Sequence, residues 1–419
     1  MFSRKSDYII ATPGAITRKV RRKKLVRLTG LALLGGAIVL VARQWEPAPS
    51  PPGLANPEPD TRPAVEQLAE AQPASESQLD KAFLRGALSE HIKAGQFPSQ
   101  LGYDNQNIYI NYTLDPNLQN WAEERLQRYN PDYGVFVALD PDTGKILAMA
   151  SSRRDQQKSS ELPLNATYPA ASTFKVITAA ATIEEGIATP QTVFAFNGKS
   201  TSLYKNQVYQ VKENKWTRRM SFKTAFAKSV NPIFGRLGAK ELGPQTLLDY
   251  AERFGFNAQF VSDFEFDNGR IEIEPGNDWQ AAESASGYTR RNTLSPLHGA
   301  AVAASIINGG KLISPSIVES VTDVQNRVLY SSDEPVTIDV LSEKTANAMQ
   351  ELMRATITEG TGRKSFRPFT RKKYPDVVAG GKTGHLSGAS PKGSYDWFIG
   401  YGERNNRRIA YAMMCINKE

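Results

Sequence analysis

Regular hydrophobic periods begin only near Leu79 and continue to the C-terminus. Two alternating segments, 133–139 and 145–150, flank the Asp140–Gly144 turn and predict a β-hairpin. Three more strand-like runs follow near the end of the chain, at 377–384, 395–401 and 408–416, with loops expected around Gly388, Gly393 and Asn405. Helical spacing lies between the two groups, at 174–185, 221–228, 245–254 and 296–307. This order predicts an α+β fold in which one antiparallel sheet collects the N- and C-terminal strands and packs against helices.

The first part of the chain has a different pattern. Residues 28–42 form an uncharged apolar run between Arg27 and Arg43, preceded by a strongly basic segment. About 20 apolar residues cross a bilayer, so we expect a transmembrane helix over 25–43 with its basic end in the cytoplasm. A cleaved signal peptide is the alternative, although no good small-residue cleavage site follows.

These boundaries predict five segments. A cytoplasmic basic tail (1–24) and the anchor (25–43) precede a Pro-rich linker (44–78), a short membrane-proximal segment (79–111) and a folded domain (112–419). We therefore expect a single-pass membrane protein with its folded domain on the extracytoplasmic side.

Charge and composition exclude several functions. Residues 1–27 carry nine basic residues and one acid, which leaves 42 basic and 42 acidic residues in the remainder. The high pI therefore gives no reason to expect a nucleic-acid partner. The single Cys415 and the three dispersed histidines, at 91, 298 and 385, do not form a metal-binding pattern, so we expect neither metal nor cofactor.

The first candidate site is the pair Ser172 and Lys175. Their spacing places both side chains on one helical face, where the amine can reach the hydroxyl. Ser172 is also a good helix N-cap, and Lys175 could be a surface charge. The residues around Lys175 are apolar almost all round, however, so the helix is expected to be buried and the pKa of the amine lowered. We interpret the pair as nucleophile and base.

Two further short segments complete an ordered set. Ser229-Val-Asn231 precedes Pro232, which places a hydroxyl and an amide at a turn between helices; a plain N-cap is the alternative. Lys382-Thr-Gly384 ends an apolar strand in which the preceding glycines invite close approach of another chain. A peptide could pair along that strand while the Lys382 and Thr383 side chains bind a carboxylate.

The three motifs SxxK, SxN and KTG occur here in the order found in serine acyltransferases of D-Ala-D-Ala and penicillin-like substrates. From about Tyr112 to Glu419, the chain resembles the transpeptidase domain of penicillin-binding proteins. Further segments carry the resemblance, namely 113–119, 138–150, 293–297, 308–310, 359–362 and 397–401.

The resemblance implies roles for the motif residues. Ser172 would attack the penultimate D-Ala carbonyl of a peptidoglycan stem peptide and Lys175 would take its proton. Ser229 would relay a proton to the departing D-Ala, and Asn231 would hold the substrate backbone.

The resemblance also assigns the strand residues. Lys382 and Thr383 would meet the terminal carboxylate. Backbone N–H groups of Ser172 and of the residue after Gly384 would form the oxyanion hole, and β-lactams would be covalent inhibitors.

Three departures from the family pattern stand out. His385 replaces the small hydroxylated residue usual after KTG, so we expect it to change acceptor choice, β-lactam affinity or pH response. Ala170-Ala171 replaces a Pro-Gly pair, and 287–292 lacks the usual glycines. Only about 70 residues separate the anchor from the domain, which is too few for the glycosyltransferase domain of bifunctional relatives or the large pedestal of monofunctional ones. The resemblance therefore implies a compact acyltransferase tethered to the bacterial inner membrane, with a membrane glycosyltransferase or scaffold protein as partner.

Three classes of function remain open from the sequence. The first is a D,D-transpeptidase that cross-links peptidoglycan. The second is a hydrolase of the same acyl-enzyme, either a D,D-carboxypeptidase or a β-lactamase-like enzyme. The third is a non-catalytic β-lactam sensor or cell-wall scaffold. No GxSxG elbow supports a Ser-His-Asp hydrolase. The intact motifs argue against a non-catalytic scaffold, and the sequence identifies no additional base that would activate water for a hydrolase. The transpeptidase is therefore favoured.

Overall fold

The computed structural model describes residues 79–155, 157, 159–367 and 374–418. The predicted tail, anchor and linker therefore lie outside the described residues. Within the described ranges, no helix has the length and apolar character needed to cross a membrane.

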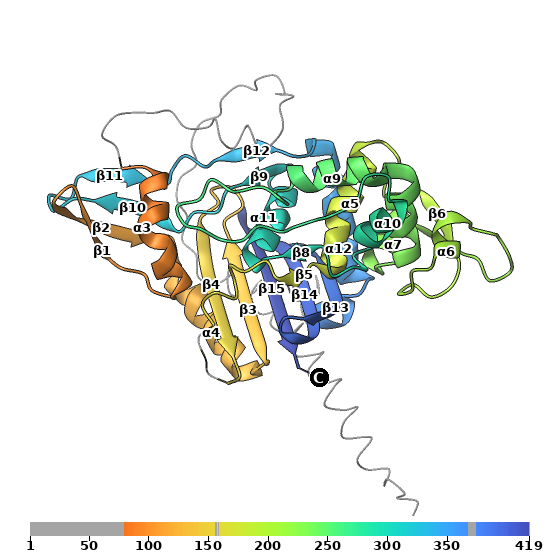
Figure 1. Cartoon of the computed structure of the whole chain (residues 1–419), viewed down its shortest axis with the longest axis horizontal. Coiled ribbons are helices and arrows are strands. Elements are labelled where there is room, and N and C mark those ends of the chain that lie inside the picture. Colours follow the sequence, from red (N-terminus) through yellow and green to blue (C-terminus); the bar gives the residue numbers. More distant parts are fainter. Residues whose placement is uncertain (1–78, 156, 158, 368–373, 419) are drawn as a thin grey trace, which may run out of the picture.

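A five-stranded antiparallel sheet forms the centre of the molecule, in the order β13-β14-β15-β3-β4 (Figure 1). The strands are β3 (Tyr133–Leu139), β4 (Ile146–Arg153), β13 (Val378–Ala389), β14 (Lys392–Arg404) and β15 (Arg407–Asn417). The first two come from the start of the domain and the last three from its end, which confirms the α+β expectation. β3 and β15 pair directly, so the hydrogen-bonded ladder joins the two ends of the domain.

The β13–β14 hairpin is longer than the sequence predicts. Gly388 and Gly393 were expected in a loop, but they pair with each other in the ladder. The ring of Tyr395 covers Gly388, leaving no room for a larger side chain. This prediction was wrong because the glycines serve close packing rather than a turn.

The two faces of the sheet are buried by different elements. α11 (Pro296–Ile307), whose residues are all buried, packs on one face against β3, β14 and β15. α4 (Pro116–Tyr129) covers the other, where Phe398 and Tyr411 stack with ring centroids 5.9 Å apart. Because both faces are covered, the strands are nearly continuous hydrophobic runs rather than strictly alternating ones.

Helices collect beside the β13 edge of the sheet and form the right-hand part of Figure 1. They are α5 (Lys175–Glu184), α7 (Phe222–Ala227), α8 (Asn231–Arg236), α9 (Gly243–Arg253), α10 (Asp278–Ser286) and α12 (Glu343–Thr358). The short α13 (Arg363–Phe366) follows α12, and its Phe366 stacks on Phe398 on the face of the sheet that α4 covers. A short 3-10 turn, η1 (Ala171–Phe174), leads into α5, and the π-helical η2 (Leu237–Leu242) joins α8 to α9. Each of the four predicted helices is present, with ends shifted by at most a few residues.

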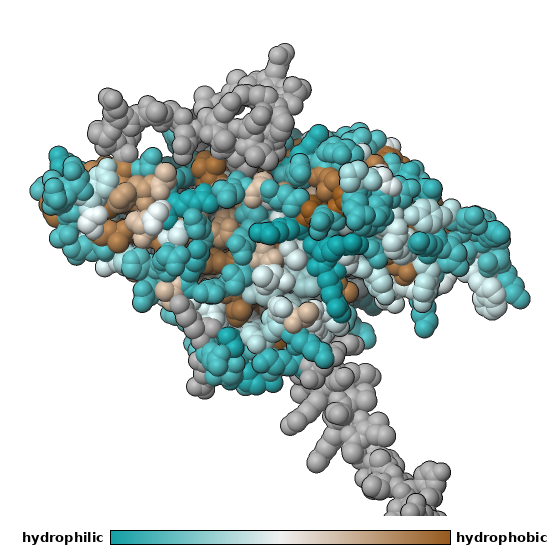
Figure 2. Space-filling model, viewed as in Figure 1, coloured by the Kyte–Doolittle hydropathy of each residue, from teal (hydrophilic) through white to brown (hydrophobic). Residues whose placement is uncertain are grey.

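The described residues also form three small two-stranded sheets outside the central sheet. They are β5 (Tyr168–Pro169) with β8 (Thr293–Leu294), β6 (Val193–Phe196) with β7 (Arg218–Ser221), and β9 (Lys311–Ile313) with β12 (Thr337–Asp339). α6 (Lys205–Tyr209) lies between β6 and β7 in sequence, at the far right of Figure 1. Figure 2 shows mainly hydrophilic side chains over this view, with hydrophobic ones in scattered patches.

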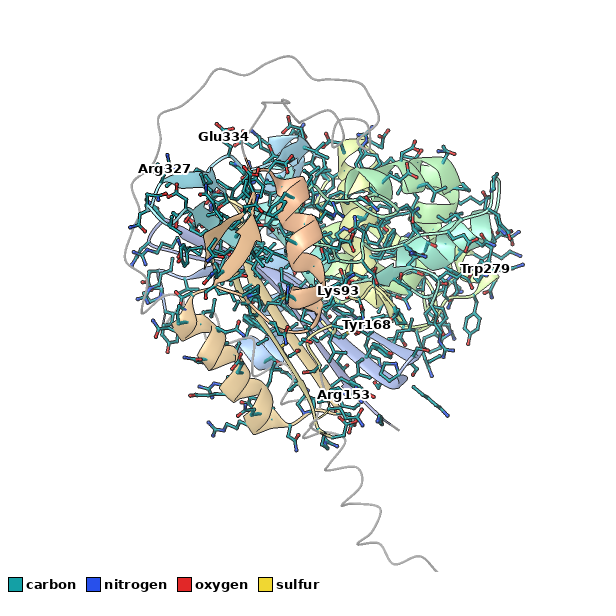
Figure 3. The ribbon with its side chains drawn as sticks, turned by 60° about the vertical axis from the view of Figure 1, so that its left-hand side comes forward. Lys93, Arg153, Tyr168, Trp279, Arg327 and Glu334 are labelled. Atoms are coloured by element: carbon teal, nitrogen blue, oxygen red, sulfur yellow. The ribbon has the colours of Figure 1, made fainter. Side chains whose placement is uncertain are left out.

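The segment 79–111 takes part in a second sheet. Its strands β1 (Gln100–Tyr103) and β2 (Gln106–Tyr112) join β10 (Val318–Thr322) and β11 (Val328–Ser331), in the order β1-β2-β10-β11. α3 (Lys81–Lys93) packs beside it, and Figure 3 shows Lys93 at the C-terminal end of this helix. Apolar residues of α3 and β2 belong to the same core cluster as the central sheet. The segment is thus packed against the 112–419 region.

Asp263 fixes the start of β10. Its fully buried carboxylate accepts hydrogen bonds from the Ser316 hydroxyl (2.7 Å) and from the backbone N–H groups of Ile317 and Val318. Burial raises the pKa of this carboxyl. The acceptor replaces water for donors that would otherwise be buried without a partner.

We expect Asp263→Ala to lower the free energy of unfolding by about 3 kcal/mol, because it leaves several buried donors unsatisfied. Urea denaturation of the full-length protein would measure this loss. Asp333→Ala, at an exposed carboxylate, is the matched control and should cost about 0.5 kcal/mol or less. Equal costs for both variants would contradict the role given to Asp263.

Candidate active site

Ser172 lies in the tight turn η1, directly before α5. Ala171 adopts a left-handed conformation (φ 51°), and Gly287 packs against its carbonyl oxygen. The capping residues of η1 and α5 are Ala170 and Phe174, and neither makes a side-chain capping bond. The N-cap interpretation of Ser172 is therefore wrong, and its half-buried hydroxyl is available for other contacts.

The amine of Lys175 is completely buried among polar partners. Its Nζ lies 2.9 Å from Ser172 Oγ and 2.8 Å from Asn231 Oδ1, and it also bonds the carbonyl oxygen of Ser286. Burial, and secondarily the charge of Lys382, hold the pKa of Lys175 well below its ordinary value. The sequence-based expectation of a buried lysine with a lowered pKa is confirmed.

The three partners of Lys175 suit a neutral amine. The oxygens of Asn231 and Ser286 are carbonyl groups and only accept, whereas the Ser172 hydroxyl can donate as well as accept. A neutral amine has two N–H bonds and one lone pair. The lone pair is therefore left facing the Ser172 hydroxyl, which is the geometry of a base beside its nucleophile.

Ser229 and Asn231 approach from the turn between α7 and α8. Ser229 is left-handed (φ 56°), and α8 begins after Val230 without a side-chain cap, so the N-cap interpretation is wrong here too. The Asn231 amide is held by its backbone N–H bond to Ser200 O (2.7 Å) and its Nδ2 bond to Thr201 O (3.1 Å). These bonds aim Oδ1 at Lys175.

Lys382 reaches Ser229 from β13. Its fully buried Nζ donates to Ser229 Oγ at 3.1 Å and to the Thr383 carbonyl at 2.9 Å. Burial lowers the pKa of Lys382 to about 7. The two lysines thus each hold one serine hydroxyl, and the charge of Lys382 contributes to the lowered pKa of Lys175.

Gly384 brings β13 against the nucleophile turn. A Cβ at this position would lie 3.1 Å from Thr173 Cγ2 and 3.3 Å from Ala170 O, so a larger residue would require small shifts of η1. The glycines for which close approach was expected, Gly380 and Gly381, instead lie against the rings of Tyr401 and Phe398 from the neighbouring strand β14. The indole N–H of Trp397, also on β14, bonds Pro169 O (3.0 Å) and ties the sheet to the chain just before the nucleophile turn.

Thr383 and His385 each have a partner that sequence reasoning missed. The Thr383 hydroxyl lies 2.5 Å from that of Thr361, whose backbone N–H in turn bonds Ala227 O before the Ser229 turn. His385 Nδ1 lies 2.7 Å from Asp396 Oδ1, its cross-strand neighbour on β14. Thr361 lies in the 359–362 segment noted above, but no sequence signal identified Asp396, because strand register brings it to His385.

A family model described as the penicillin binding protein transpeptidase domain matches residues 134–419. The chain belongs to this family. Stage V sporulation protein D of Bacillus subtilis is 28% identical over 300 residues, which cover 65% of this chain and 43% of that protein. Peptidoglycan D,D-transpeptidase PbpA of Mycolicibacterium smegmatis is 27% identical over 362 residues, covering 75% of this chain and 68% of the relative.

A solved structure shows the same fold. It is the imipenem acyl-enzyme complex of penicillin-binding protein A from M. tuberculosis, with 25% identity, a TM-score of 0.59 and coverage of 76% of each chain. The fold of this transpeptidase-family chain therefore extends beyond the short motifs to most of the described residues.

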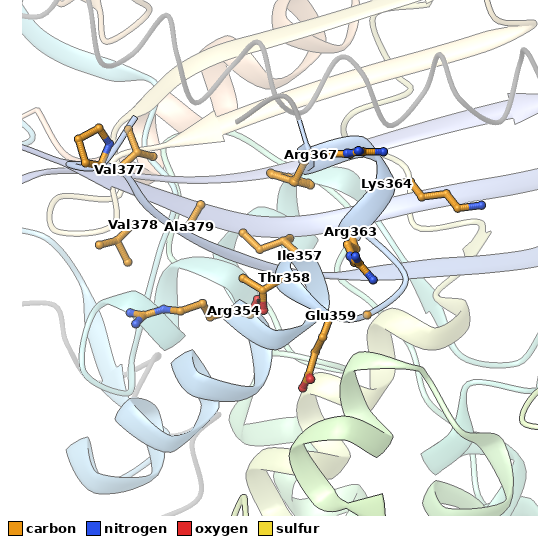
Figure 4. A pocket seen from close by; sticks show the side chains of 13 residues that line it. Arg354, Ile357, Thr358, Glu359, Arg363, Lys364, Arg367, Val377, Val378 and Ala379 are labelled. Carbon is orange, nitrogen blue, oxygen red and sulfur yellow. Dashed lines mark hydrogen bonds between the residues drawn. The ribbon is translucent and has the colours of Figure 1, made fainter. Parts of the chain in front are cut away.

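A separate cavity of about 890 Å³ opens beside the start of β13. It is lined by the end of α12, by α13 and by β13, and includes Arg354, Glu359 and Arg363 (Figure 4). None of the motif residues lines it. This cavity is therefore distinct from the candidate active site, which the hydrogen bonds among the motif residues define.

We expect Gly287→Ala to disturb the nucleophile turn, because a Cβ there would collide with the Ala171 carbonyl and φ is left-handed (63°). The substitution should lower the free energy of unfolding by about 3 kcal/mol and slow acylation of Ser172 by penicillin. Urea denaturation and intact-mass kinetics would measure the two effects.

Gly276→Ala is the matched control. Gly276 has a similar φ (72°) but open space around it, so only the backbone strain of about 1 kcal/mol should remain. If both variants lost the same stability and the same reactivity, contact with Ala171 would have no part in holding the turn.

Proposed function

We propose that this protein is a serine D,D-transpeptidase that cross-links peptidoglycan stem peptides through an acyl-enzyme on Ser172. The observation that carries the proposal is the buried Lys175 amine, 2.9 Å from Ser172 Oγ, with both other partners restricted to accepting. Such an amine can take the serine proton without assistance from a carboxylate or histidine.

Acylation would proceed in two stages. Ser172 Oγ attacks the carbonyl carbon of the penultimate D-Ala while its proton passes to Lys175 Nζ. The developing oxyanion is stabilised by the backbone N–H groups of Ser172 and His385, each donor worth about 3 kcal/mol in comparable sites. Collapse of this intermediate breaks the amide bond and leaves the acyl group on Ser172.

The leaving D-Ala needs a proton on its nitrogen. Ser229 supplies it and is reprotonated by the proton that Lys175 accepted, either directly or through Lys382, whose Nζ is 3.1 Å from the Ser229 hydroxyl. Lys382 and Thr383 hold the terminal carboxylate. An acceptor amine then attacks the acyl-enzyme, forms the cross-link and returns the proton to Ser172 Oγ, which restores the free enzyme.

The similar proteins support this reaction class. The M. smegmatis relative is named a peptidoglycan D,D-transpeptidase, and the M. tuberculosis protein is solved as a β-lactam acyl-enzyme. The chain spans less than half of the B. subtilis relative. We therefore also propose that peptidoglycan is the substrate and that β-lactams are covalent inhibitors. The folded domain would lie on the extracytoplasmic side and act with a membrane partner.

Incubation of the full-length protein with benzylpenicillin tests the nucleophile. We expect one covalent adduct on the wild-type protein and none on Ser172→Ala, with acylation slowed at least about 1,000-fold in Lys175→Met. Intact mass spectrometry over hours would record the adduct, and Ser305→Ala, at a buried serine away from the motifs, is the control. An adduct that persists in Ser172→Ala would refute the proposal.

The pH profile of acylation should be bell-shaped. Burial, and secondarily the charge of Lys382, hold the pKa of Lys175 well below its ordinary value, so the rate rises with pH as this base becomes neutral. Above about pH 7, Lys382 loses its proton and its attraction for the substrate carboxylate, so the second-order rate constant falls.

A penicillin methyl ester, which lacks that carboxylate, separates the two limbs. The descending limb near pH 7 should disappear with the ester while the ascending limb remains. A descending limb of equal size with both compounds would show that carboxylate binding by Lys382 is not its cause.

A hydrolase of the same acyl-enzyme is the second candidate, favoured by the His385–Asp396 pair. With Nδ1–H donating to Asp396, Nε2 of His385 is left as an acceptor that can activate water. The sequence contained no recognisable base for deacylation. This pair would supply one on the same residue that carries an oxyanion-binding backbone N–H.

His385→Thr distinguishes the candidates. For a hydrolase we expect the penicilloyl adduct to decay in the wild type and to persist at least about tenfold longer in His385→Thr and Asp396→Asn. Stopped incubations followed by mass analysis would give both lifetimes. Equal, slow decay in all three proteins would leave the transpeptidase as the surviving candidate.

A further inference from the structure

Arg290 crosses from the helical side of the site to β13. It lies in the segment 287–292 after α10, where the sequence departs from the family pattern, and its Nε donates to the Ser387 carbonyl at 2.8 Å. The neighbouring Arg291 instead pairs with Glu283 at 2.9 Å. Two adjacent exposed arginines therefore have different roles, and only Arg290 reaches the strand.

The bond to Ser387 lies on the open edge of β13. This strand is the edge strand of the central sheet and pairs only with β14 there, so a side chain from the helical region reaches it from the unpaired side. In an antiparallel ladder, alternate residues present their backbone groups to the same edge. Thr383, His385 and Ser387 therefore share the open edge, and Lys382 and Arg290 occupy the carbonyls of Thr383 and Ser387.

The path of the acyl donor follows from this arrangement, and this step rests on the proposed function. With the terminal carboxylate at Lys382 and Thr383 and the reacting carbonyl at the His385 N–H, the rest of the donor must extend toward Ser387. Two strand residues span about 7 Å, which matches the reach from the reacting carbonyl to the side chain of the preceding donor residue. That side chain therefore arrives at Arg290.

The guanidinium of Arg290 has unused donors. Among the described residues, no carboxylate forms an ion pair with it, and Nε is the nitrogen that bonds Ser387. Asp396, on the neighbouring strand β14, is engaged by His385. The two terminal amino groups of a guanidinium match the geometry of a carboxylate.

We propose that Arg290 is a specificity residue that binds the side-chain carboxylate of the donor residue preceding the D-Ala pair. The preferred donor is then a stem peptide with a diaminodicarboxylic acid, such as diaminopimelate, at that position. A donor with lysine at that position lacks the side-chain carboxylate, and in amidated diaminopimelate an uncharged carboxamide takes the place of the carboxylate. By occupying the Ser387 carbonyl, Arg290 also ends strand pairing at this residue and so fixes where the side chain turns off the strand.

Acylation of the full-length protein by two synthetic pentapeptides tests this inference. They differ only in a carboxylate or carboxamide on the diaminopimelate side chain. We expect the wild type to prefer the carboxylate by about tenfold in second-order acylation rate, and Arg290→Gln to lose this preference. Arg290→Lys should retain part of it, because charge remains without the bidentate geometry.

Arg291→Gln is the matched control and should keep the wild-type preference. If Arg290→Gln slowed acylation by both peptides and by benzylpenicillin to the same extent, Arg290 would only hold the loop, and the inference would be overturned. A wild-type protein that reacts with both peptides equally would overturn it as well. Failure of the wild type to react with either peptide or with penicillin would instead be a failure of the proposed function.

Discussion

The burial of one amine, that of Lys175, is the constraint on which the site depends. A lysine removed from water is costly unless its partners replace hydration, and here they are Ser172, Asn231 and the Ser286 carbonyl. Each partner comes from a different element, namely η1, α8 and α10. The arrangement of these elements around α5 is therefore inseparable from the chemistry that the amine can perform.

β13 has an equally central place because it is both a wall of the core and an open edge. On one side it pairs with β14 over its whole length, and on the other Gly384 lies against η1. The Thr361–Thr383 contact and the bond from Thr361 to Ala227 tie this edge to the turn that carries Ser229. The strand thus restrains the turns that carry Ser172 and Ser229.

Two of the three departures from the family pattern lie at this same edge. His385 takes Asp396 as partner, and Arg290, from the unusual 287–292 segment, bonds Ser387 two residues later. Neither contact involves the nucleophile directly. Under the proposed function, both lie where an extended peptide donor would leave the reacting centre, which separates the contacts proposed for substrate choice from the lysine–serine cluster.

Local sequence patterns by themselves determined much of the secondary structure of this protein and part of its site. Apolar periodicity predicted the central sheet and its main helices, and the spacing of Ser172 and Lys175 predicted their contact, because both depend on residues near in sequence. The extent of the β13–β14 hairpin, the partners Ser286, Thr361 and Asp396, and the reach of Arg290 were decided only by tertiary structure. These contacts join residues up to more than a hundred positions apart through strand register and helix packing, which no local period encodes.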